Sequence, residues 1–570
     1  MRSLVDDAIS AVEKKEASEE KIYKIVTKYQ KNRYINNSYR HFRNPMTPLG
    51  YLALITRFSL KVPPLRKTHV LAPKTGVIRH IVQADGTERT EIPRNRYSGD
   101  GTLVAHLSFA LRREDLNLTV LAALFEHDEA LRAIQEWLKE TPTSTLARIA
   151  AHLAKWLSPA TFVYSLPAGA PRIPVLDPNK YVTAPGQSDT QMGVINNVLG
   201  TQDFCPIVRL TDRLKALLAL DIQSKIAQAL DAIEPEMLLR AIDYLYLAET
   251  RSTFSIEREI PDNERATKFR RLLESAGEPG PLTEDQLCDW QNSIVSKYAT
   301  EMSFRTKQNW LSRSGRLRNI ADFIPPSPQH VQSMMEGVAK VAQLGAEKSL
   351  DPTIAAACAA FGLVFVHPFY DGNGRLHRFL IHHVLRQAGV TPAGVVLPIS
   401  ARMLNNLDSY GKLLKGYSRP RTALLEYALD SDSQTIHVRS SQPTWLYASF
   451  DATEICEYIL SCIEQCVETD LAQEVRYLRA YDRTKNRLET WLDLPQPKLD
   501  LLIRLIVQEH GELSQRKRKL YDMMSEEDLA RVQTVVSDEF QDFIIAQGST
   551  EPQGRSMKTR SQSAPYNKDL

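Results

Sequence analysis

The chain is poor in cysteine, and its cysteines are not arranged for disulfides or metal binding. Six occur in 570 residues, and none has the C-x₂-C spacing typical of structural zinc sites. Disulfide frameworks belong mostly to small secreted domains, so this composition indicates reduced thiols. We therefore expect a cytoplasmic protein with no metal at its cysteines, which are Cys205, Cys288, Cys358, Cys456, Cys462 and Cys466.

Long hydrophobic runs and a strong net charge are also missing. The longest apolar run, residues 354–366, is shorter than the roughly 20 residues needed to cross a bilayer. The N-terminus has no apolar core of a secretory signal, so we expect no such signal. With 71 basic and 68 acidic residues the net charge is only +3, and we expect neither a membrane nor a nucleic-acid partner.

A P-loop, the glycine-rich pattern that cradles phosphates in many nucleotide-binding proteins, is absent as well. One stretch nevertheless concentrates polar chemistry: His367-Pro-Phe-Tyr-Asp-Gly-Asn-Gly-Arg-Leu-His-Arg378. The apolar run 354–366 precedes it, and residues 375–387 have a helical pattern. The stretch is therefore predicted to be a loop between a buried helix and the N-terminus of a second helix.

The glycines and arginines of this stretch suit phosphate binding. A helix N-terminus presents unpaired N–H groups and a partial positive charge. Gly372 and Gly374 allow the backbone to approach an anion closely. Arg375 and Arg378 are three residues apart, so they emerge on one face of the predicted helix, where guanidinium groups bind phosphate oxygens.

A carboxylate and an imidazole complete the set. Asp371 is a hard oxygen ligand suited to Mg²⁺ that is shared with phosphates. His367 accepts a proton near neutral pH. Together these side chains predict the transfer of a phosphate-bearing group to a hydroxyl. The alternative is an ordinary Gly-Asn turn between two core helices.

The stretch resembles the Fic (Fido) motif, His-x-Phe-x-(Asp/Glu)-Gly-Asn-Gly-Arg-x-x-Arg, at every specified position. The resemblance implies a protein adenylyltransferase, which moves AMP from ATP to a Ser, Thr or Tyr hydroxyl of a target protein. It implies that His367 is the base, that Asp371 holds Mg²⁺, and that Phe369 is a packing anchor. The implied phosphate-binding residues are Gly372, Asn373, Gly374, Arg375 and Arg378, with Asn373 at the α-phosphate.

An upstream segment, Thr253-Phe-Ser-Ile-Glu257, resembles the family's inhibitory helix, (Ser/Thr)-x-x-x-Glu-(Gly/Asn). The resemblance implies that Glu257 pairs with Arg378 and occupies the group that a γ-phosphate needs. Arg258 stands where the family has Gly or Asn, which leaves the geometry of this contact open. An exposed helix with a solvated Glu257 is the alternative.

A flap is the other feature implied by the resemblance. Residues 302–310 and 323–328 resemble the stretch that contains the family's flap, a small β-hairpin that holds the backbone of the target beside the motif. An ordinary exposed loop is the alternative. The resemblance as a whole covers roughly residues 239–417.

We expect a mainly α protein in which a Fic (Fido) helical domain is flanked by helical regions. The predicted parts are an N-terminal region (1–195), the Fic-like domain (196–425, with the inhibitory helix near 250–260), a C-terminal helical region (426–547) and a disordered tail (548–570). In the N-terminal region, apolar spacing predicts helices over residues 102–111, 116–131 and 144–157.

Three functions stay open at this point. The first is adenylyl transfer held back by Glu257, and the second is removal of AMP from a modified protein by a water that Glu257 orients. The third is a DNA-binding regulator with a vestigial Fic site, because the basic run 513–520 could belong to a helix-turn-helix or winged helix. A solvated helix face is the alternative for that run.

Two smaller points accompany these hypotheses. The histidines beside the motif, His377, His382 and His383, are expected to pack or to lie at the surface, because a metal shared with phosphates prefers oxygen ligands. The sequence leaves the oligomeric state and the target protein open.

Overall fold

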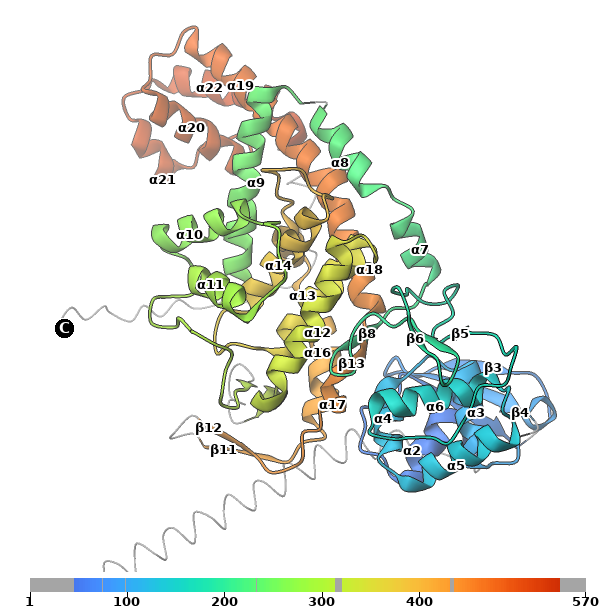
Figure 1. Ribbon diagram of the computed structural model, residues 1–570. Coiled ribbons are helices and arrows are strands. Elements are labelled where there is room, and N and C mark those ends of the chain that lie inside the picture. The colour runs from blue at the N-terminus through green and yellow to red at the C-terminus, as the bar shows by residue number, and fades with distance from the viewer. Residues whose placement is uncertain are drawn as a thin grey trace, which may run out of the picture. The chain divides into compact units, whose positions relative to one another are not determined.

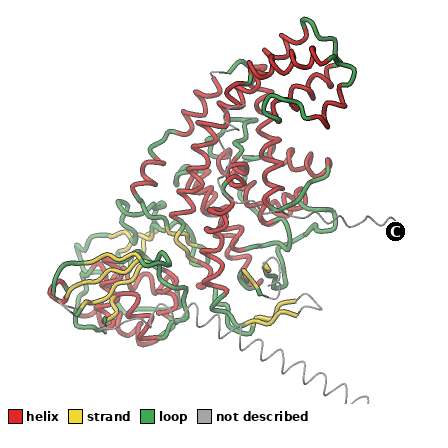
Figure 2. Tube along the Cα trace, turned by 180° about the vertical axis from the view of Figure 1, so that it is seen from behind, coloured by secondary structure: helices red, strands yellow, loops and turns green. Residues whose placement is uncertain are grey.

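The computed structural model describes residues 46–73, 75–97, 99–231, 233–312, 320–430 and 435–543. Within these ranges helices dominate and strands form small sheets, so the mainly α class is confirmed (Figure 1, Figure 2). The predicted tail and the first 45 residues of the predicted N-terminal region lie outside the described residues. The chain divides into two compact units, 1–228 with 245–468 and 229–244 with 469–570.

The N-terminal part of the first unit combines helices with a sheet that the sequence did not predict. The strand order is β1–β2–β4–β3, and β2 and β4 are parallel. These strands are β1 (Thr47–Leu49), β2 (Lys67–Ala72), β3 (Arg79–Val82) and β4 (Glu88–Pro93). The helices, whose apolar side chains share one core, are α2 (Gly50–Phe58), α3 (Leu103–Arg113), α4 (Leu118–Phe125), α5 (Asp128–Glu140) and α6 (Thr145–Leu157).

The single helix predicted over residues 116–131 is wrong, because the structure has two. His127, between α4 and α5, is extended with φ of −100° and ψ of 117°. Every residue of α4 is buried, whereas α5 has one apolar face and begins with Asp128 and Glu129. One straight helix could not satisfy both environments, and acidic residues favour a helix start at this position.

Short strands join distant parts of the first unit. β8 (Cys205–Ile207) pairs in parallel with β13 (Ser449–Asp451), so segments far apart in the sequence lie side by side. The other small sheets are formed by β5 (Ile173–Pro174), β6 (Gln187–Asp189) and β7 (Val194–Asn196), by β9 (Leu311–Ser312) and β10 (Ala321–Phe323), and by β11 (Tyr427–Asp430) and β12 (Thr435–Val438).

A helix without a polar face lies at the centre of this unit. Every residue of α13 (Pro352–Val366) after the first is buried, and the Asp351 carboxylate caps its N-terminus. α12 (Pro328–Ala346), α14 (Asn373–Gln387) and α18 (Thr453–Gln465) pack around it (Figure 1). The buried helix predicted before the motif is thus confirmed.

The first unit has further helices, of which α8 ends in the second unit. They are α7 (Asp212–Leu218), α8 (Ile222–Asp231), the end of α9 (Pro235–Ile256), α10 (Asn263–Glu274), α11 (Glu284–Ile294), α15 (Ile399–Asn405), α16 (Leu407–Thr422) and α17 (Trp445–Ala448).

The second unit is built from helices with a separate apolar core. They are α19 (Leu471–Glu489), α20 (Gln496–Gln508), α21 (Gln515–Arg518) and α22 (Glu526–Glu539), joined by the first residues of α9. No strand occurs among the residues of this unit that the structure describes, so no paired strands of a winged helix are seen there.

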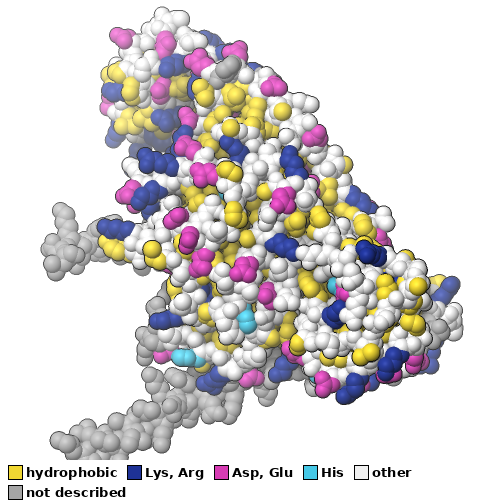
Figure 3. Space-filling model, viewed as in Figure 1, with side chains coloured by type: hydrophobic (Ala, Val, Ile, Leu, Met, Phe, Trp, Pro, Cys, Tyr) yellow, Lys and Arg dark blue, Asp and Glu magenta, His cyan; other side chains and the backbone are white. Residues whose placement is uncertain are grey.

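The basic run lies in and after α21, and part of its charge is already balanced. Lys517 pairs with Glu509 at 2.7 Å, and Arg518 pairs with Glu526 at 2.8 Å. On the face drawn in Figure 3, basic and acidic side chains are interspersed rather than gathered by sign. Both observations favour a solvated helix face over a nucleic-acid contact.

The cysteines are free thiols and all six are buried. The Cys358 and Cys456 sulfurs lie 3.8 Å apart in the core between α13 and α18. In the described ranges, no helix is both long and apolar enough to cross a membrane.

The close packing around α13 gives a stability test. A Cβ atom on Gly345 of α12 would lie 2.4 Å from the Ala355 Cβ, so Gly345→Ala should lower the free energy of unfolding by about 1–3 kcal/mol. The matched control is Gly416→Ala in α16, which meets no atom within 4 Å and should stabilise by roughly 0.5–1 kcal/mol. Urea unfolding measures both, and shifts of the same sign would contradict the close contact.

Candidate active site

His367 ends α13 and is held as a neutral imidazole. Its backbone is left-handed, with φ of 55°, so the chain turns sharply at this residue. Its Nδ1 lies 3.2 Å from the Val364 carbonyl oxygen, which leaves Nε2 as the nitrogen that can accept a proton. Burial lowers the pKa of His367 to about 4, and the charge of Arg305 acts in the same direction. The ring is therefore neutral at physiological pH, as a general base must be.

The loop after His367 is closed by its own side chains. Asn373 Oδ1 accepts the Phe369 N–H at 3.0 Å, and its Nδ2 donates to the Phe369 carbonyl at 2.7 Å. Gly372 precedes α14 with φ of 86°, a conformation that glycine adopts without strain. Because the Asn373 amide is engaged within the loop, the backbone N–H groups at the start of α14 are what the loop offers to an anion.

Both motif arginines are buried, each with only 1% of its surface exposed. Arg378 donates to Glu257 Oε1 at 2.8 Å, and also to the hydroxyl and the carbonyl of Thr253 at 2.7 and 2.9 Å. Arg375 donates to Asp371 Oδ1 at 3.1 Å. Burial opposes the charge of Arg378, but Glu257 and Tyr410 together more than offset burial and raise the pKa of Arg378. The structure thus pairs Glu257 with Arg378, as the resemblance implied, and adds Thr253 as a further partner of Arg378.

Two guanidinium donors at this position stay unsatisfied by the described residues. They are Arg375 Nε and Arg378 Nη1, and both atoms are buried. An unsatisfied buried donor costs about 1–3 kcal/mol. Both belong to the first turns of α14, where the helix dipole is also positive. An anion bound here would supply the missing acceptors.

Arg258, the departure from the family pattern, lies in a left-handed turn with φ of 61°. The Glu259 N–H donates across this turn to the Phe254 carbonyl at 3.0 Å. Glycine and asparagine adopt positive φ most readily, which gives a physical reason for the family's preference. Arg258 adopts the same conformation, so the turn is kept.

Glu259, which the sequence did not single out, returns to the site after this turn. Its Oε2 accepts from Arg375 Nη1 at 3.0 Å and from Arg265 Nη2 at 2.7 Å. In a continuous helix this side chain would point elsewhere, so only the structure reveals the contact.

Arg305 was also missed, although it anchors the motif loop. Its side chain is 2% exposed and donates to the carbonyls of His367 (2.8 Å), Pro326 (2.5 Å), Lys307 (3.3 Å) and Val366 (3.4 Å). Burial lowers its pKa to about 10, so it stays charged near neutral pH. The Arg305 side chain thus links His367, at the end of α13, to the chain before and after the flap.

The β-hairpin expected at the flap is present as β9 and β10, which pair antiparallel. The residues that connect them, 313–319, lie outside the described residues. The Lys307 N–H donates to the Tyr370 hydroxyl at 2.9 Å, and the Tyr370 N–H donates to Glu301 at 2.8 Å. The flap segment is thereby bound to the motif loop.

The three histidines of α14 are buried and have protein partners. His377 Nε2 lies 3.0 Å from the Tyr410 hydroxyl, His382 Nε2 lies 2.9 Å from Glu249, and the Gly277 N–H donates to His383 Nδ1 at 3.2 Å. These contacts agree with the packing role expected for them.

Asp371 fits a magnesium ion that arrives with a nucleotide. Its side chain is half exposed, and Oδ1 accepts the Gly372 N–H at 2.6 Å. Mg²⁺ commonly takes one or two carboxylates and completes its shell with phosphates and water. In the described part of the chain, no three His, Cys, Asp or Glu side chains gather as a metal site, so a fully protein-held ion does not fit.

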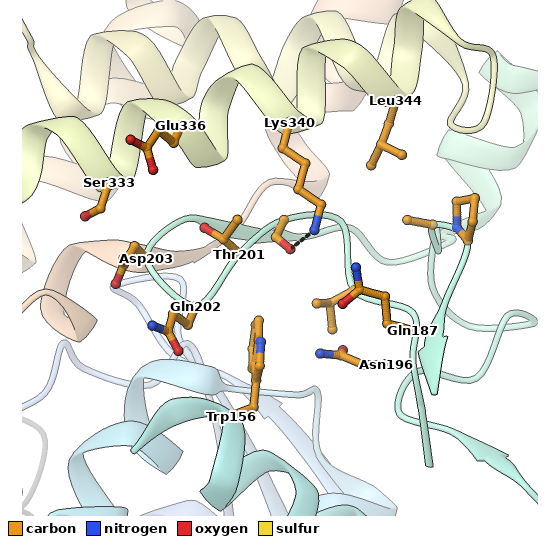
Figure 4. Close-up of a pocket in the computed structure, with 14 residues that line it drawn as sticks. Trp156, Gln187, Asn196, Thr201, Gln202, Asp203, Ser333, Glu336, Lys340 and Leu344 are labelled. Atoms are coloured by element: carbon orange, nitrogen blue, oxygen red, sulfur yellow. Dashed lines mark hydrogen bonds between the residues drawn. The ribbon is translucent and has the colours of Figure 1, made fainter. Parts of the chain in front are cut away.

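A separate cavity of about 490 Å³ lies between the N-terminal part and α12 (Figure 4). Trp156, Asn196 and Lys340 are among its lining residues, and Lys340 Nζ lies 3.4 Å from the Gly200 carbonyl. No residue of the motif lines this cavity, so it is not part of the motif site.

Residues 281–385, which include the flap segment and the motif, match the model of the Fic/DOC family. This segment is similar to Fic domains. The protein adenylyltransferase fic-1 of Caenorhabditis elegans is 34% identical over 93 residues, which cover 16% of this chain and 18% of that protein. The protein adenylyltransferase Fic of Drosophila mojavensis is 36% identical over 83 residues, or 15% and 16% of the two chains. The chain thus spans less than a fifth of the length of these curated relatives.

Solved structures show weaker overall similarity to this chain. A Fic domain containing signaling protein from Bacteroides thetaiotaomicron has 18% identity and a TM-score of 0.33, covering 47% of this chain and 97% of its own. Fic-1 from C. elegans, residues 134–508, has 15% identity and a TM-score of 0.28, covering 66% and 95%.

The Arg305 anchor predicts a large effect on stability. Arg305→Met removes the donors to four carbonyls and should lower the free energy of unfolding by about 2–3 kcal/mol. Lys307→Met, two residues away with an exposed side chain, is the control and should change it by less than about 0.5 kcal/mol. Chemical denaturation measures both variants, and equal effects would contradict the anchor.

Proposed function

We propose that this chain is a protein adenylyltransferase that transfers AMP from ATP to a Ser, Thr or Tyr hydroxyl of a target protein. The observation that carries the proposal is a neutral His367 and Asp371 in one loop, followed by two buried arginines in the first turns of α14, within a segment similar to Fic domains. The curated relatives of this segment are named protein adenylyltransferases, which supports the same reaction.

The chemistry follows from the positions of these groups. The target hydroxyl oxygen forms a bond to the α-phosphorus of ATP, the bond to the bridging oxygen breaks, and pyrophosphate leaves. His367 Nε2 accepts the hydroxyl proton. Arg375, Arg378 and the N–H groups of α14 stabilise the negative charge of the phosphates. Mg²⁺ held at Asp371 would supply further positive charge at the phosphates.

We further propose that Glu257 holds the resting enzyme in an inhibited state. A Cβ atom on Gly374 would lie 2.2 Å from Glu257 Oε1, so the carboxylate sits directly at the glycine of the anion-binding turn. The same oxygen binds Arg378 at 2.8 Å. A γ-phosphate and Glu257 therefore need the same guanidinium group.

Removal of AMP from a modified protein is the second candidate reaction. It is favoured by the same position of Glu257, a carboxylate at the anion-binding turn that is able to orient an attacking water. Incubating an AMP-modified target with Mg²⁺ or with Mn²⁺, and following release of AMP, separates the two directions.

The setting in which this enzyme works is also proposed. Six buried free thiols fit a reducing cytoplasm. The partners are ATP and a protein that presents a hydroxyl beside the flap, where an extended segment could add to the hairpin.

The position of the ATP label tests the reaction. Label from the α-phosphate should appear on protein weakly with the native chain and more strongly with Glu257→Gly. His367→Ala should reduce it by about 10²–10⁴-fold because the base is lost. His80→Ala, which changes an exposed histidine on β3, is the control and should keep full activity. Transfer of a γ-phosphate label instead would reveal a kinase reaction and refute adenylyl transfer.

The pH dependence gives a further test. Because the pKa of His367 is lowered to about 4, the base stays neutral as the pH falls through 6.5. For the Glu257→Gly variant, we expect kcat/KM to show no histidine titration between pH 8 and 6 and to fall only as the pH nears the lowered value. A half-maximal rate near pH 6.5 that follows His367 would show that the imidazole is solvated.

A further inference from the structure

We propose that Glu259 is a second inhibitory carboxylate, which competes with nucleotide phosphate for Arg375 while Glu257 competes for Arg378. This inference rests on the proposed function, because it concerns the regulation of the same phosphate site. Its basis is a pair of contacts: Glu259 Oε2 to Arg375 Nη1 at 3.0 Å, and Glu257 Oε1 to Arg378 Nη2 at 2.8 Å.

The turn at Arg258 is what allows both contacts. Successive residues of an α-helix are rotated by about 100°, so residues 257 and 259 of a continued helix would point to nearly opposite sides. Instead α9 ends at Ile256 and Arg258 adopts a φ of 61°. The reversal brings the two carboxylates onto two arginines that are three residues apart on α14, and therefore on one face of it.

The inhibitory segment holds Arg375 in a second way. The Arg375 guanidinium lies 5.4 Å from the centre of the Phe254 ring, and the Arg265 guanidinium lies 5.1 Å from the same ring. Phe254 is fully buried and belongs to α9, as does Thr253, which binds Arg378. The aromatic face and the Glu259 carboxylate thus fix Arg375 to the same segment that carries Glu257.

A second cationic partner, Arg265, allows Glu259 to lose its ion pair with Arg375. Glu259 Oε2 also accepts from Arg265 Nη2 at 2.7 Å, and the Glu259 side chain is 34% exposed. When a phosphate takes Arg375, Glu259 keeps one cation and stays in contact with water. Arg375 is fully buried and cannot exchange its partner for water in the same way.

Two inhibitory contacts predict a release in two steps. Loss of Glu257 alone removes the carboxylate from Arg378, which keeps its hydrogen bonds to Thr253, but leaves Arg375 paired with Glu259. If Glu259 instead only positioned Arg375 for phosphate, its removal would weaken nucleotide binding. The sign of the change in nucleotide affinity therefore separates competition from positioning.

The experiment measures the affinity of full-length variants for a non-reactive α,β-methylene analogue of ATP with Mg²⁺ by calorimetry. On a Glu257→Gly background, Glu259→Gln should tighten binding about two- to five-fold, as expected for removing a partly exposed ion pair. Glu264→Gln on the same background is the matched control, because Glu264 pairs only with Lys268 on α10 in the ion pairs described, and should change nothing. Unchanged or weaker binding by the Glu259→Gln double variant would overturn the proposal.

Transfer of α-labelled AMP by the same variants separates this inference from the proposed reaction. Tighter binding without any protein labelling would keep Glu259 as a competitor for phosphate and refute adenylyl transfer. The opposite result is strong labelling by the Glu257→Gly variant, with no further increase at low ATP and no change in analogue affinity when Glu259→Gln is added. That result would refute the role of Glu259 and leave the reaction intact.

Discussion

Two positive charges buried at the start of α14 dominate the structure around them. A guanidinium group removed from water needs anionic or hydrogen-bonding partners, because an unpaired buried charge is strongly destabilising. Arg375 and Arg378 each have only 1% of their surface exposed. Carboxylates balance their charge in the present structure but leave one donor of each unsatisfied, and phosphates offer the same kind of acceptor. In the proposed function, inhibition and nucleotide binding are therefore alternative ways to balance the same two charges.

The difference in burial between the partners decides which of them moves. Glu257 and Glu259 side chains are about one third exposed, at 35% and 34%, while the arginines that they bind are enclosed. The surroundings of the arginines are also rigid: α13 is buried after its first residue, and Arg305 fixes the His367 carbonyl at its end. In the proposed exchange of partners, the carboxylates would therefore move and the motif loop would stay in place.

How far the sequence predicted this site depends on the distance between the residues involved. The motif from His367 to Arg378 is contiguous, so residue types and spacing were enough to place a base, an anion-binding turn and two arginines. Arg305 and Glu259 act across 62 and 116 residues, and Glu259 does so only through the left-handed turn at Arg258. The N-terminal sheet was missed because short strands such as β1 carry no clear alternation and depend on distant partners.

Before Thr253 and Glu257, a buried carboxylate holds α9 against neighbouring helices, which limits the part of this segment that can move. Glu249 is fully buried and binds His382 of α14 as well as the backbone N–H and hydroxyl of Ser400 at the start of α15. Breaking such a network leaves buried polar groups unpaired and is costly. Thr253 lies one turn later, so adjustment at the site is confined to the last turn of α9 and the turn at Arg258. Under the proposed competition, phosphate binding would therefore require movement only of the segment that carries Glu257 and Glu259, and not of the helices around Glu249.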